Sequence, residues 1–408
     1  MSEPLIESVE TPAPRAQPPR VAHLIDSLDV SGGAERQLVA NLRAFDHDLI
    51  RHDIVLLKSA AVSRAAEIPD EVNIWLLGDD KQPMSRFQAT LALYRLVRRE
   101  RFDLLHASLP DSALAARLVG LATGTPVVES LVNISHEEVR TVDNPGVTMA
   151  KLRLHRWLDR LTTFRVRRFH AVSNAVADSW ADTVKINRRR IDVIPRGIDR
   201  GQFGVGDEER TTHRASVLEE FRLPDDTFLV IAVGRQEPQK GHRYLLEAAH
   251  RLREEVPNLR ILIVGRTGLA SGRLNKLIED LGIGDIVTLA GSRTDLPRLL
   301  AASDVFAFPS LFEGNGGNAM IEAMAIGLPI VTTGVPPMTD LVPSDEFGLL
   351  VPRTDSEALT AALARLAADP GLRQRLGAAA SERAAGFATP EESARRYETW
   401  YREILDVG

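Results

Sequence analysis

Short apolar runs alternate with longer amphipathic segments along the chain from Arg20 onward. The short runs are rich in β-branched residues or leucine, as are parallel strands buried on both faces. In the longer segments the apolar residues recur with the spacing of one helix face. This alternation predicts an α/β protein with doubly wound parallel sheets.

The alternation occurs twice, so we expect two Rossmann-like domains in tandem. The predicted strands of the first half are Val21–Ile25, Ile54–Leu57, Val72–Leu77, Leu104–His106, Val127–Glu129, Arg168–Val172 and Ile191–Ile194. Those of the second half are Phe228–Val233, Arg260–Val264, Val287–Ala290, Val305–Phe308, Ile330–Thr332 and Gly348–Val351. Predicted helices lie between them, among them Ala34–Phe45, Ser85–Arg99, Thr148–Arg165, His242–Glu255, Asn318–Ile326 and Ser356–Ala368.

Local composition and the positions of glycine and proline predict the boundaries of the domains. Residues 1–19 are rich in Pro and Glu and predict a disordered tail. The first domain is expected over 20–197 and the second over 227–390, with a glycine-containing linker over 198–226. The last helix, 391–408, carries Tyr397, Trp400 and Tyr401 and is expected to dock on another surface.

Charge and residue usage exclude several classes of function. Fifty basic against fifty-six acidic residues give a net charge of −6, which argues against a nucleic-acid partner. The absence of cysteine excludes disulfide scaffolds, zinc ribbons, iron–sulfur clusters and thiol nucleophiles. No apolar run approaches the roughly 18–20 residues of a membrane span. We expect a cytoplasmic protein, with peripheral contact at the inner face of the membrane.

The first candidate binding element is Ser31-Gly32-Gly33-Ala34-Glu35, at a strand-to-helix turn. Glycines there let phosphate or sugar oxygens approach backbone N–H groups at a helix N-terminus. The alternative is an ordinary tight turn. The stretch is not the G-x-G-x-x-G fingerprint of dinucleotide-binding proteins, which disfavours a dehydrogenase.

The second element follows the first strand of the second domain and contains Arg235, Lys240 and Gly241. Arginine can fork onto phosphate oxygens and lysine adds a point charge. Two cations at one strand end predict a diphosphate clamp. The alternative is a pair of solvated surface bases.

The third element is the glycine-rich loop from Pro309 into the helix at Asn318. Its N–H donors and the helix dipole suit an anion. Glu313 lies on the loop and Glu322 about one turn into the helix, on the same face as Asn318. Carboxylates beside a phosphate site are expected only where they bind hydroxyls. The alternatives are a turn residue for Glu313 and an exposed helix carboxylate for Glu322.

Over most of residues 20–405 the chain resembles family 4 of the retaining glycosyltransferases, which have the GT-B fold. The matching stretches are GGAER (32–36), HAVSNAVADSW (170–180), VIPRGID (193–199), VGRQEPQKG (233–241) and GSRTDLPRLLAASDVFAFPSLFEGNGGNAMIEAMAIGLPIVTT (291–333). The resemblance implies two Rossmann-like domains facing across a cleft, with the last helix packed on the first.

The resemblance also implies roles for single residues. Arg235 and Lys240 would hold the donor diphosphate, Glu322 the ribose hydroxyls and Glu313 the donor sugar. Gly32 and Gly33 would approach the donor from the first domain. Backbone amides of the loop would cradle the sugar and phosphates; these are Gly314, Asn315, Gly316, Gly317 and Asn318.

Some positions depart from the family. Glu313 and Glu322 have eight residues between them instead of the usual seven, and Arg196 stands where the family often has Asn. The common H-x-H is His106-Ala107-Ser108, with one histidine missing. His106 is expected at a strand end facing the cleft, as a hydrogen-bond donor to the sugar or transferred oxygen, or else as a structural residue. His136 is a weaker acceptor-side candidate.

No metal or cofactor is expected. Asp46-His47-Asp48 matches a D-x-D metal motif, but it follows a helix, which favours a polar surface turn. A basic amphipathic segment, 151–168, suits an anionic membrane surface. The alternative is a core-packed helix with a solvated basic face.

The function expected is that of a retaining hexosyltransferase. It would move a sugar from a UDP- or GDP-linked donor to a hydroxyl of a glycan, lipid-linked or small-molecule acceptor, in surface polysaccharide or glycoconjugate synthesis. The alternatives are a nucleotide-sugar epimerase of the same fold and a sugar-nucleotide-binding scaffold without catalysis.

Overall fold

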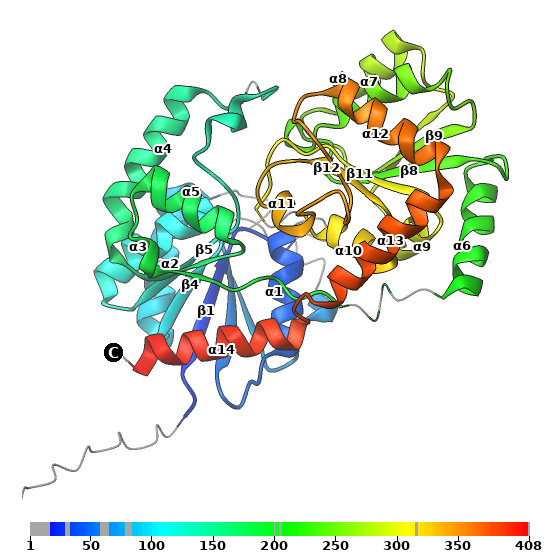
Figure 1. The fold of residues 1–408 in the computed structure, drawn as a ribbon. Helices are drawn as coiled ribbons and strands as arrows, with labels where there is room; N and C mark the ends of the chain where they lie inside the picture. The colour runs from blue at the N-terminus through cyan, green and yellow to red at the C-terminus, as the bar shows by residue number, and fades with distance from the viewer. Residues whose placement is uncertain are drawn as a thin grey trace, which may run out of the picture.

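The structure is a computed structural model that describes residues 17–28, 33–57, 65–77, 84–144, 146–199, 201, 203, 206–314 and 317–406. The expected tail, 1–19, lies almost wholly outside these residues. Figure 1 shows two α/β domains side by side, each built on one parallel sheet. The predicted architecture of two doubly wound Rossmann-like domains is confirmed.

The first domain has a seven-stranded sheet of order β3-β2-β1-β4-β5-β6-β7. Its strands are β1 (Arg20–Ile25), β2 (Arg51–Leu56), β3 (Asn73–Leu76), β4 (Leu104–Ala107), β5 (Val127–Leu131), β6 (Val166–Ala171) and β7 (Ile191–Val193). Its helices are α1 (Gly33–Ala44), α2 (Arg86–Glu100), α3 (Pro110–Thr123), α4 (Met149–Thr162) and α5 (Asn174–Val184). One face of the sheet packs on α2, α3 and α5 and the other on α1 and the last helix.

The second domain has a six-stranded sheet of order β10-β9-β8-β11-β12-β13. Its strands are β8 (Phe228–Val233), β9 (Leu259–Val264), β10 (Val287–Gly291), β11 (Val305–Phe308), β12 (Ile330–Thr333) and β13 (Leu349–Val351). Its helices are α6 (Asp207–Glu220), α7 (His242–Leu252), α8 (Ser271–Leu281), α9 (Leu296–Ala301), α10 (Asn318–Ile326), α11 (Met338–Leu341), α12 (Ser356–Ala368) and α13 (Pro370–Ala385). The strand order reverses between β8 and β11, as it does between β1 and β4. Ligands of such sheets bind beyond the strand ends at these two points.

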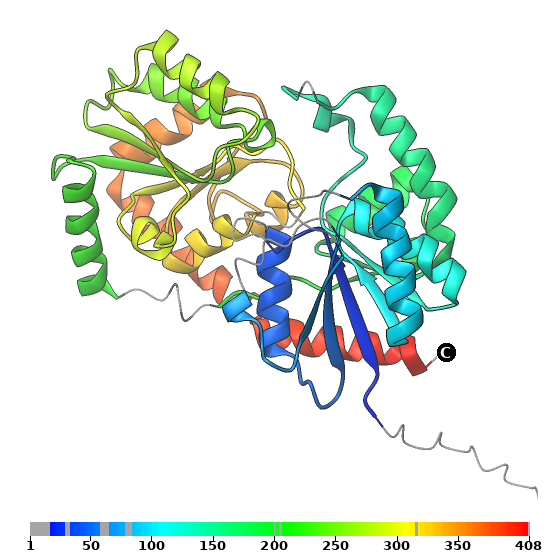
Figure 2. The ribbon, with the colours of Figure 1, turned by 180° about the vertical axis from the view of Figure 1, so that it is seen from behind.

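The chain crosses between the domains twice, and the two crossings touch. The amide of Ile198 donates to the carbonyl of Ala388 at 2.9 Å, and the Ser393 hydroxyl donates to the carbonyl of Pro195 at 3.0 Å. The last helix, α14 (Pro390–Asp406), then runs along the first domain beside α1, as both views show (Figures 1 and 2). Both crossings therefore lie at the same edge of the two domains.

Aromatic residues of α14 cover a cluster of buried histidines on the first sheet. The Tyr401 hydroxyl lies 2.6 Å from Nδ1 of His106, and the Tyr397 hydroxyl lies 2.9 Å from Nε2 of His170. The Trp400 indole N–H donates to Asp192 at 2.7 Å. Because the hydroxyls of Tyr401 and Tyr397 hydrogen-bond to His106 and His170, α14 can bury these rings without leaving their hydroxyls unpaired.

The histidine cluster predicts a loss of stability in mild acid. Burial lowers the pKa of His23 to about 3 and that of His170 to about 4, and it lowers the pKa of His52 and His106 well below the usual value. The unfolded chain therefore binds more protons than the folded one below pH 6.5. The stabilisation is complete above that pH and is lost as the pH falls, by about 1.4 kcal/mol per histidine per pH unit.

Urea unfolding measured between pH 7 and pH 5 checks this expectation. The free energy of unfolding should fall by several kcal/mol over that range, because four groups contribute. An unchanged free energy would show that the imidazoles are not buried as neutral groups.

Candidate active site

A cleft of about 710 Å³ separates the domains where the two sheets present their carboxyl ends. The first domain lines it with Gly33, Ala34, Glu35, Arg36, Leu109, Val132, Asn133 and Arg196. The second domain contributes a larger and more charged wall, which includes Gly234, Arg235, Lys240, Arg266, Arg293, Glu313, Gly314, Gly317, Asn318 and Glu322. The cleft thus brings cations and carboxylates together from both domains.

Lys240 is held by a tight turn after β8. It ends a short 3₁₀ helix, and Gly241 follows in the left-handed region, with φ at +63°. A Cβ at Gly241 would lie 2.0 Å from the carbonyl oxygen of Pro309, so the turn needs glycine there. The turn brings Lys240 Nζ to 2.5 Å from Oε1 of Glu313 and 5.1 Å from the centre of the Phe308 ring.

Glu313 is buried at the floor of the cleft. The Ser310 hydroxyl donates to Oε1 at 2.6 Å, to the same oxygen that pairs with Lys240. Arg235, in contrast, keeps 47% of its side chain exposed and lies 3.8 Å from Glu237. Of these two cations, Lys240 is already paired and Arg235 is largely open to a ligand.

Glu322 joins the domains across the cleft. Its Oε1 accepts a hydrogen bond from Arg36 Nη2 of α1 at 3.1 Å, whereas its Oε2 is buried and has no hydrogen-bond partner. Burial raises the pKa of this carboxyl, and the guanidinium of Arg36 opposes that shift. A buried oxygen without a partner is costly, so this atom is suited to accept from a ligand hydroxyl.

The structure gathers most of the residues predicted for the donor site. The cleft is lined by Gly33, Arg235, Lys240, Glu313, Gly314, Gly317, Asn318 and Glu322. The predicted positions Gly32, Asn315 and Gly316 lie outside the described residues. The binding roles of the cleft-lining residues stay predictions, because the structure shows only that these residues lie close together.

The prediction that His106 faces the cleft is wrong. The side chain is 3% exposed, with Nδ1 at 2.6 Å from the Tyr401 hydroxyl and Nε2 at 2.7 Å from the Ser130 hydroxyl. β4 extends to Ala107, so His106 lies inside the strand beneath α14 and not at its end. Both ring nitrogens serve the packing of the first domain.

Two other polar candidates also have structural contacts. His136 is buried against the Trp180 ring and lies 2.9 Å from Asp159. Asp46 and Asp48 lie in a turn after α1, where the amide of Asp48 donates to the Asp46 carboxylate at 3.0 Å. Over the described part of the chain, no three His, Asp or Glu side chains gather as a metal site would require.

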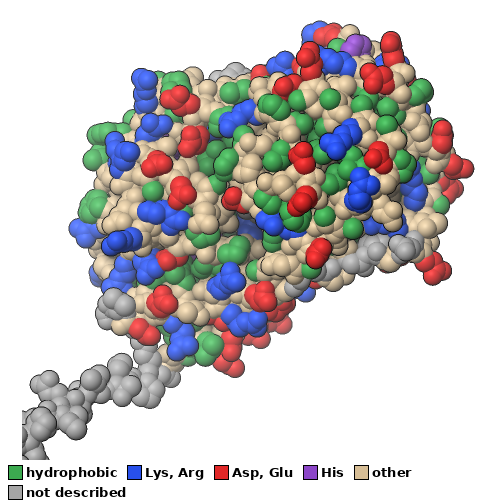
Figure 3. Space-filling view, in the orientation of Figure 1, with side chains coloured by type: hydrophobic (Ala, Val, Ile, Leu, Met, Phe, Trp, Pro, Cys, Tyr) green, Lys and Arg blue, Asp and Glu red, His purple; other side chains and the backbone are tan. Residues whose placement is uncertain are grey.

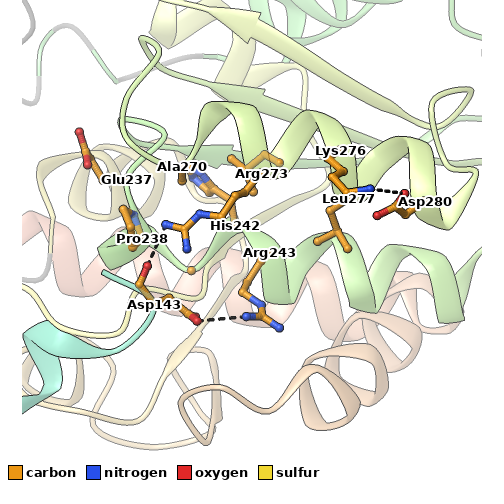
Figure 4. Close-up of a pocket in the computed structure, with 12 residues that line it drawn as sticks. Asp143, Glu237, Pro238, His242, Arg243, Ala270, Arg273, Lys276, Leu277 and Asp280 are labelled. Carbon is orange, nitrogen blue, oxygen red and sulfur yellow. Dashed lines mark hydrogen bonds and ion pairs between the residues drawn. The ribbon is translucent and has the colours of Figure 1, made fainter. Parts of the chain in front are cut away.

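A loop of the first domain, 132–148, reaches the second domain at Asp143 (Figure 4). The Asp143 carboxylate accepts from Arg243 Nη1 at 3.0 Å and from the Tyr244 hydroxyl at 2.9 Å. Its carbonyl accepts from Arg273 Nη2 at 2.8 Å. In Figure 1 this loop, which precedes α4, meets α7 and α8 away from the edge where the chain crosses. The domains are therefore held together at a second point.

Two residues of the cleft region have roles that the sequence did not reveal. Arg36, which pairs with Glu322, lies one helical turn after Gly33, and that spacing could have placed it on the cleft side of α1. The Ser173 hydroxyl donates to the Gly314 carbonyl at 2.6 Å and also caps α5. No local pattern distinguishes this contact from an ordinary helix cap.

Comparison with known proteins shows which family the chain belongs to. A model described as Glycosyltransferase Family 4 matches residues 31–202, and one described as Glycosyl transferases group 1 matches residues 214–383. A D-inositol 3-phosphate glycosyltransferase of Mycobacteroides abscessus is 30% identical over 314 residues, which are 75% of this chain and 67% of that protein. The chain is a member of glycosyltransferase family 4.

Other relatives of this family 4 glycosyltransferase differ in acceptor. A UDP-Gal:alpha-D-GlcNAc-diphosphoundecaprenol alpha-1,3-galactosyltransferase of Escherichia coli is 27% identical over 301 residues, 73% of each chain.

Among solved structures, Anabaena Alr3699/HepE with UDP-glucose has a TM-score of 0.76 at 19% identity and covers 95% of this chain and 100% of that one. Sucrose-phosphate synthase from Thermosynechococcus elongatus has a TM-score of 0.79 at 20% identity and covers 96% and 100%. At these identities the structures show the shared fold.

The contact at Gly314 predicts that one methyl group blocks closure of this family 4 enzyme. A Cβ at Gly314 would lie 1.9 Å from the backbone oxygen of Val132 in the first domain. Gly314→Ala should push the cleft walls apart and lower the transfer rate by about a hundredfold, as displacements near 1 Å can. Steady-state transfer assays and the radius of gyration from X-ray scattering measure both effects.

Gly272→Ala is the matched control, because nothing lies within 4 Å of a Cβ there. Equal activity of the two variants would contradict the close contact between the domains.

Proposed function

We propose that this enzyme transfers a hexose from a UDP- or GDP-linked donor to a hydroxyl of a glycan, lipid-linked or small-molecule acceptor, with retention of the anomeric configuration. The observation that carries the proposal is the pairing of cations with buried carboxylates in one cleft. Arg235 and Lys240 suit a diphosphate, and the unpartnered Oε2 of Glu322 suits a sugar or ribose hydroxyl.

The charges of the cleft support a mechanism of leaving-group stabilisation. As the sugar–phosphate bond breaks, negative charge builds on the diphosphate. Lys240, Arg235 and the N-terminal end of α10 line the same cleft, and their positive charge would stabilise the leaving diphosphate. Protein cations would then do the work that a metal ion does elsewhere, which is why we propose that the reaction needs none.

The ion pair between Lys240 and Glu313 holds both groups ready for the donor. Lys240 would turn from Glu313 to a phosphate oxygen, and Glu313 would accept from a hydroxyl of the donor sugar. Glu313 is buried and Lys240 is 17% exposed, so little water reaches the pair to weaken either interaction. Closure of the domains would exclude the water that otherwise hydrolyses the donor.

Replacing Lys240 tests the clamp. Lys240→Ala should lower the rate of transfer about a hundredfold or more, by analogy with the loss of one charge-stabilising donor. Initial rates with the preferred nucleotide sugar give the measurement, and Lys276→Ala, a lysine 74% exposed on α8, is the control. Near-normal turnover of Lys240→Ala would refute the clamp. Donor binding without transfer by the unaltered protein would favour a scaffold.

We also propose that the acceptor side meets an anionic membrane through α4. Exposed apolar side chains project from α4 and the turn after it, among them Leu154, Trp157, Leu161 and Phe164. Figure 3 shows hydrophobic and basic side chains mixed along this edge of the first domain. No described helix is both long and apolar enough to cross a bilayer, so the contact would lie at the surface.

The basic residues of this segment divide into two groups. Arg156, Arg160 and Arg167 donate to backbone carbonyls of His136, Val184 and Ile404, and Arg168 pairs with Asp192. Lys151, Arg153 and Arg165 are exposed beside the apolar side chains. This arrangement favours a helix that packs on the domain and still presents charge and apolar surface to lipid.

Vesicle sedimentation tests the membrane contact. The protein should bind vesicles that contain phosphatidylglycerol and not vesicles of phosphatidylcholine alone, because both charge and apolar burial contribute. Trp157→Ser with Leu161→Ser should lower the binding about tenfold or more. Leu269→Ser, at a residue 69% exposed on the second domain, is the control. Equal loss in both variants, or binding independent of lipid charge, would contradict the contact.

A further inference from the structure

Arg196 extends from the first domain to the wall of the cleft. It follows β7 in the first crossing segment, and its Nη1 lies 3.3 Å from the Gly33 carbonyl and 3.5 Å from Oδ1 of Asn318. Gly33 begins α1 and Asn318 begins α10, so the guanidinium lies between the N-terminal ends of helices from both domains. It lines the cleft and also a smaller cavity beneath it, which His106, Ser130 and Tyr397 share.

The charge of Arg196 is less compensated than those of its neighbours. Lys240 pairs with Glu313, Arg36 pairs with Glu322, and Arg235 lies near Glu237. Of the described carboxylates, none lies within ion-pair distance of Arg196. Its Nε is buried and has no hydrogen-bond partner.

Burial also acts against the charge itself. It lowers the pKa of the guanidinium, which Glu35 and Glu313 oppose only from a distance. A partly buried cation without an ion-pair partner is costly to a protein. The position of the Arg196 guanidinium is explained if a bound ligand supplies the anion that pairs with it.

We propose that Arg196 binds an oxygen of the donor's leaving diphosphate, and so contributes a first-domain cation to the site. This inference rests on the proposed function. The helix end that Asn318 begins is the one expected to face the diphosphate, and Arg196 already lies beside it. Arginine suits the task because its planar fork can bind two phosphate oxygens at once.

The position of Arg196 ties leaving-group binding to domain closure. Arg235 and Lys240 contact the diphosphate from the second domain alone, whereas Arg196 reaches it only when the domains are together. The full set of cations is then assembled only in the closed enzyme. An open enzyme would hold the donor with the cations of the second domain alone and would stabilise its departure less.

Calorimetric titration of nucleotides tests the proposal. Whichever of UDP and GDP binds the unaltered protein is compared with its monophosphate, which lacks the outer phosphate. Arg196→Gln should weaken the diphosphate at least about tenfold and change the monophosphate less than about twofold, because charged hydrogen bonds are strong. Arg196→Lys should restore part of the preference. Arg189→Gln, at an exposed arginine of the same domain, should change neither.

Thermal unfolding separates a binding role from a structural one. Without ligand, Arg196→Gln should be at least as stable as the unaltered protein, since it removes an uncompensated charge. A clear loss of stability with equal weakening of both nucleotides would mean that Arg196 only holds the domains in place, and would overturn the proposal.

Arg196 could instead bind a phosphate group of the acceptor. Titration with inorganic phosphate distinguishes this role from binding of the donor diphosphate. Phosphate is titrated into protein saturated with the diphosphate. If Arg196→Gln abolishes phosphate binding there but leaves diphosphate affinity unchanged, Arg196 serves the acceptor and the proposal is wrong. If the unaltered protein prefers neither diphosphate to its monophosphate, the proposed function itself fails.

Discussion

The partly buried ion pair between Lys240 and Glu313 is the interaction on which the cleft depends. It places a cation and a carboxylate 2.5 Å apart at the end of β8 and β11, where two helices of the second domain begin. The buried Glu313 carboxylate would be unstable there alone, because it is largely removed from water and needs the charge of Lys240 beside it. Together they form a polar surface that can exchange partners with a ligand carrying both phosphates and hydroxyls. Arg36 and Glu322 form a second ion pair in the cleft, in which an exposed arginine of the first domain contacts a buried carboxylate of the second.

Contacts between the two domains hold these charged side chains on facing walls of the cleft. The first domain closes the cleft through Val132, whose carbonyl lies against Gly314, and through Asp143, which α7 and α8 hold by three hydrogen bonds. At the opposite edge the two crossing segments bond to each other, and α14 fixes the second of them to the first sheet. These contacts between the domains therefore help to fix the distance between the two walls of the cleft, although the residues that make them need not bind a ligand.

Much of the fold followed from local pattern, because buried parallel strands are short apolar runs. The polar start of β2 was missed, since Asp53 is buried there by bonds to Arg20, Asn73 and Trp75 that join distant segments. α13 was missed because its alanines and charged residues form no clear apolar stripe. Lys240, Glu313 and other cleft-lining positions on loops of the second domain could be predicted from glycine and charge at strand ends. His106 was misplaced because only α14, far along the chain, decides what covers that strand.

The central claim is that the cleft binds a nucleoside diphosphate sugar through groups of both domains. Thermal unfolding with a panel of UDP- and GDP-linked sugars tests it most directly, since a ligand at 100 times its Kd stabilises a protein by about 2.7 kcal/mol. The account predicts that one sugar nucleotide raises the unfolding midpoint by a few degrees without added metal. It also predicts that Glu322→Gln loses most of that shift. No shift with any member of the panel, or a shift that Glu322→Gln leaves intact, would contradict the account.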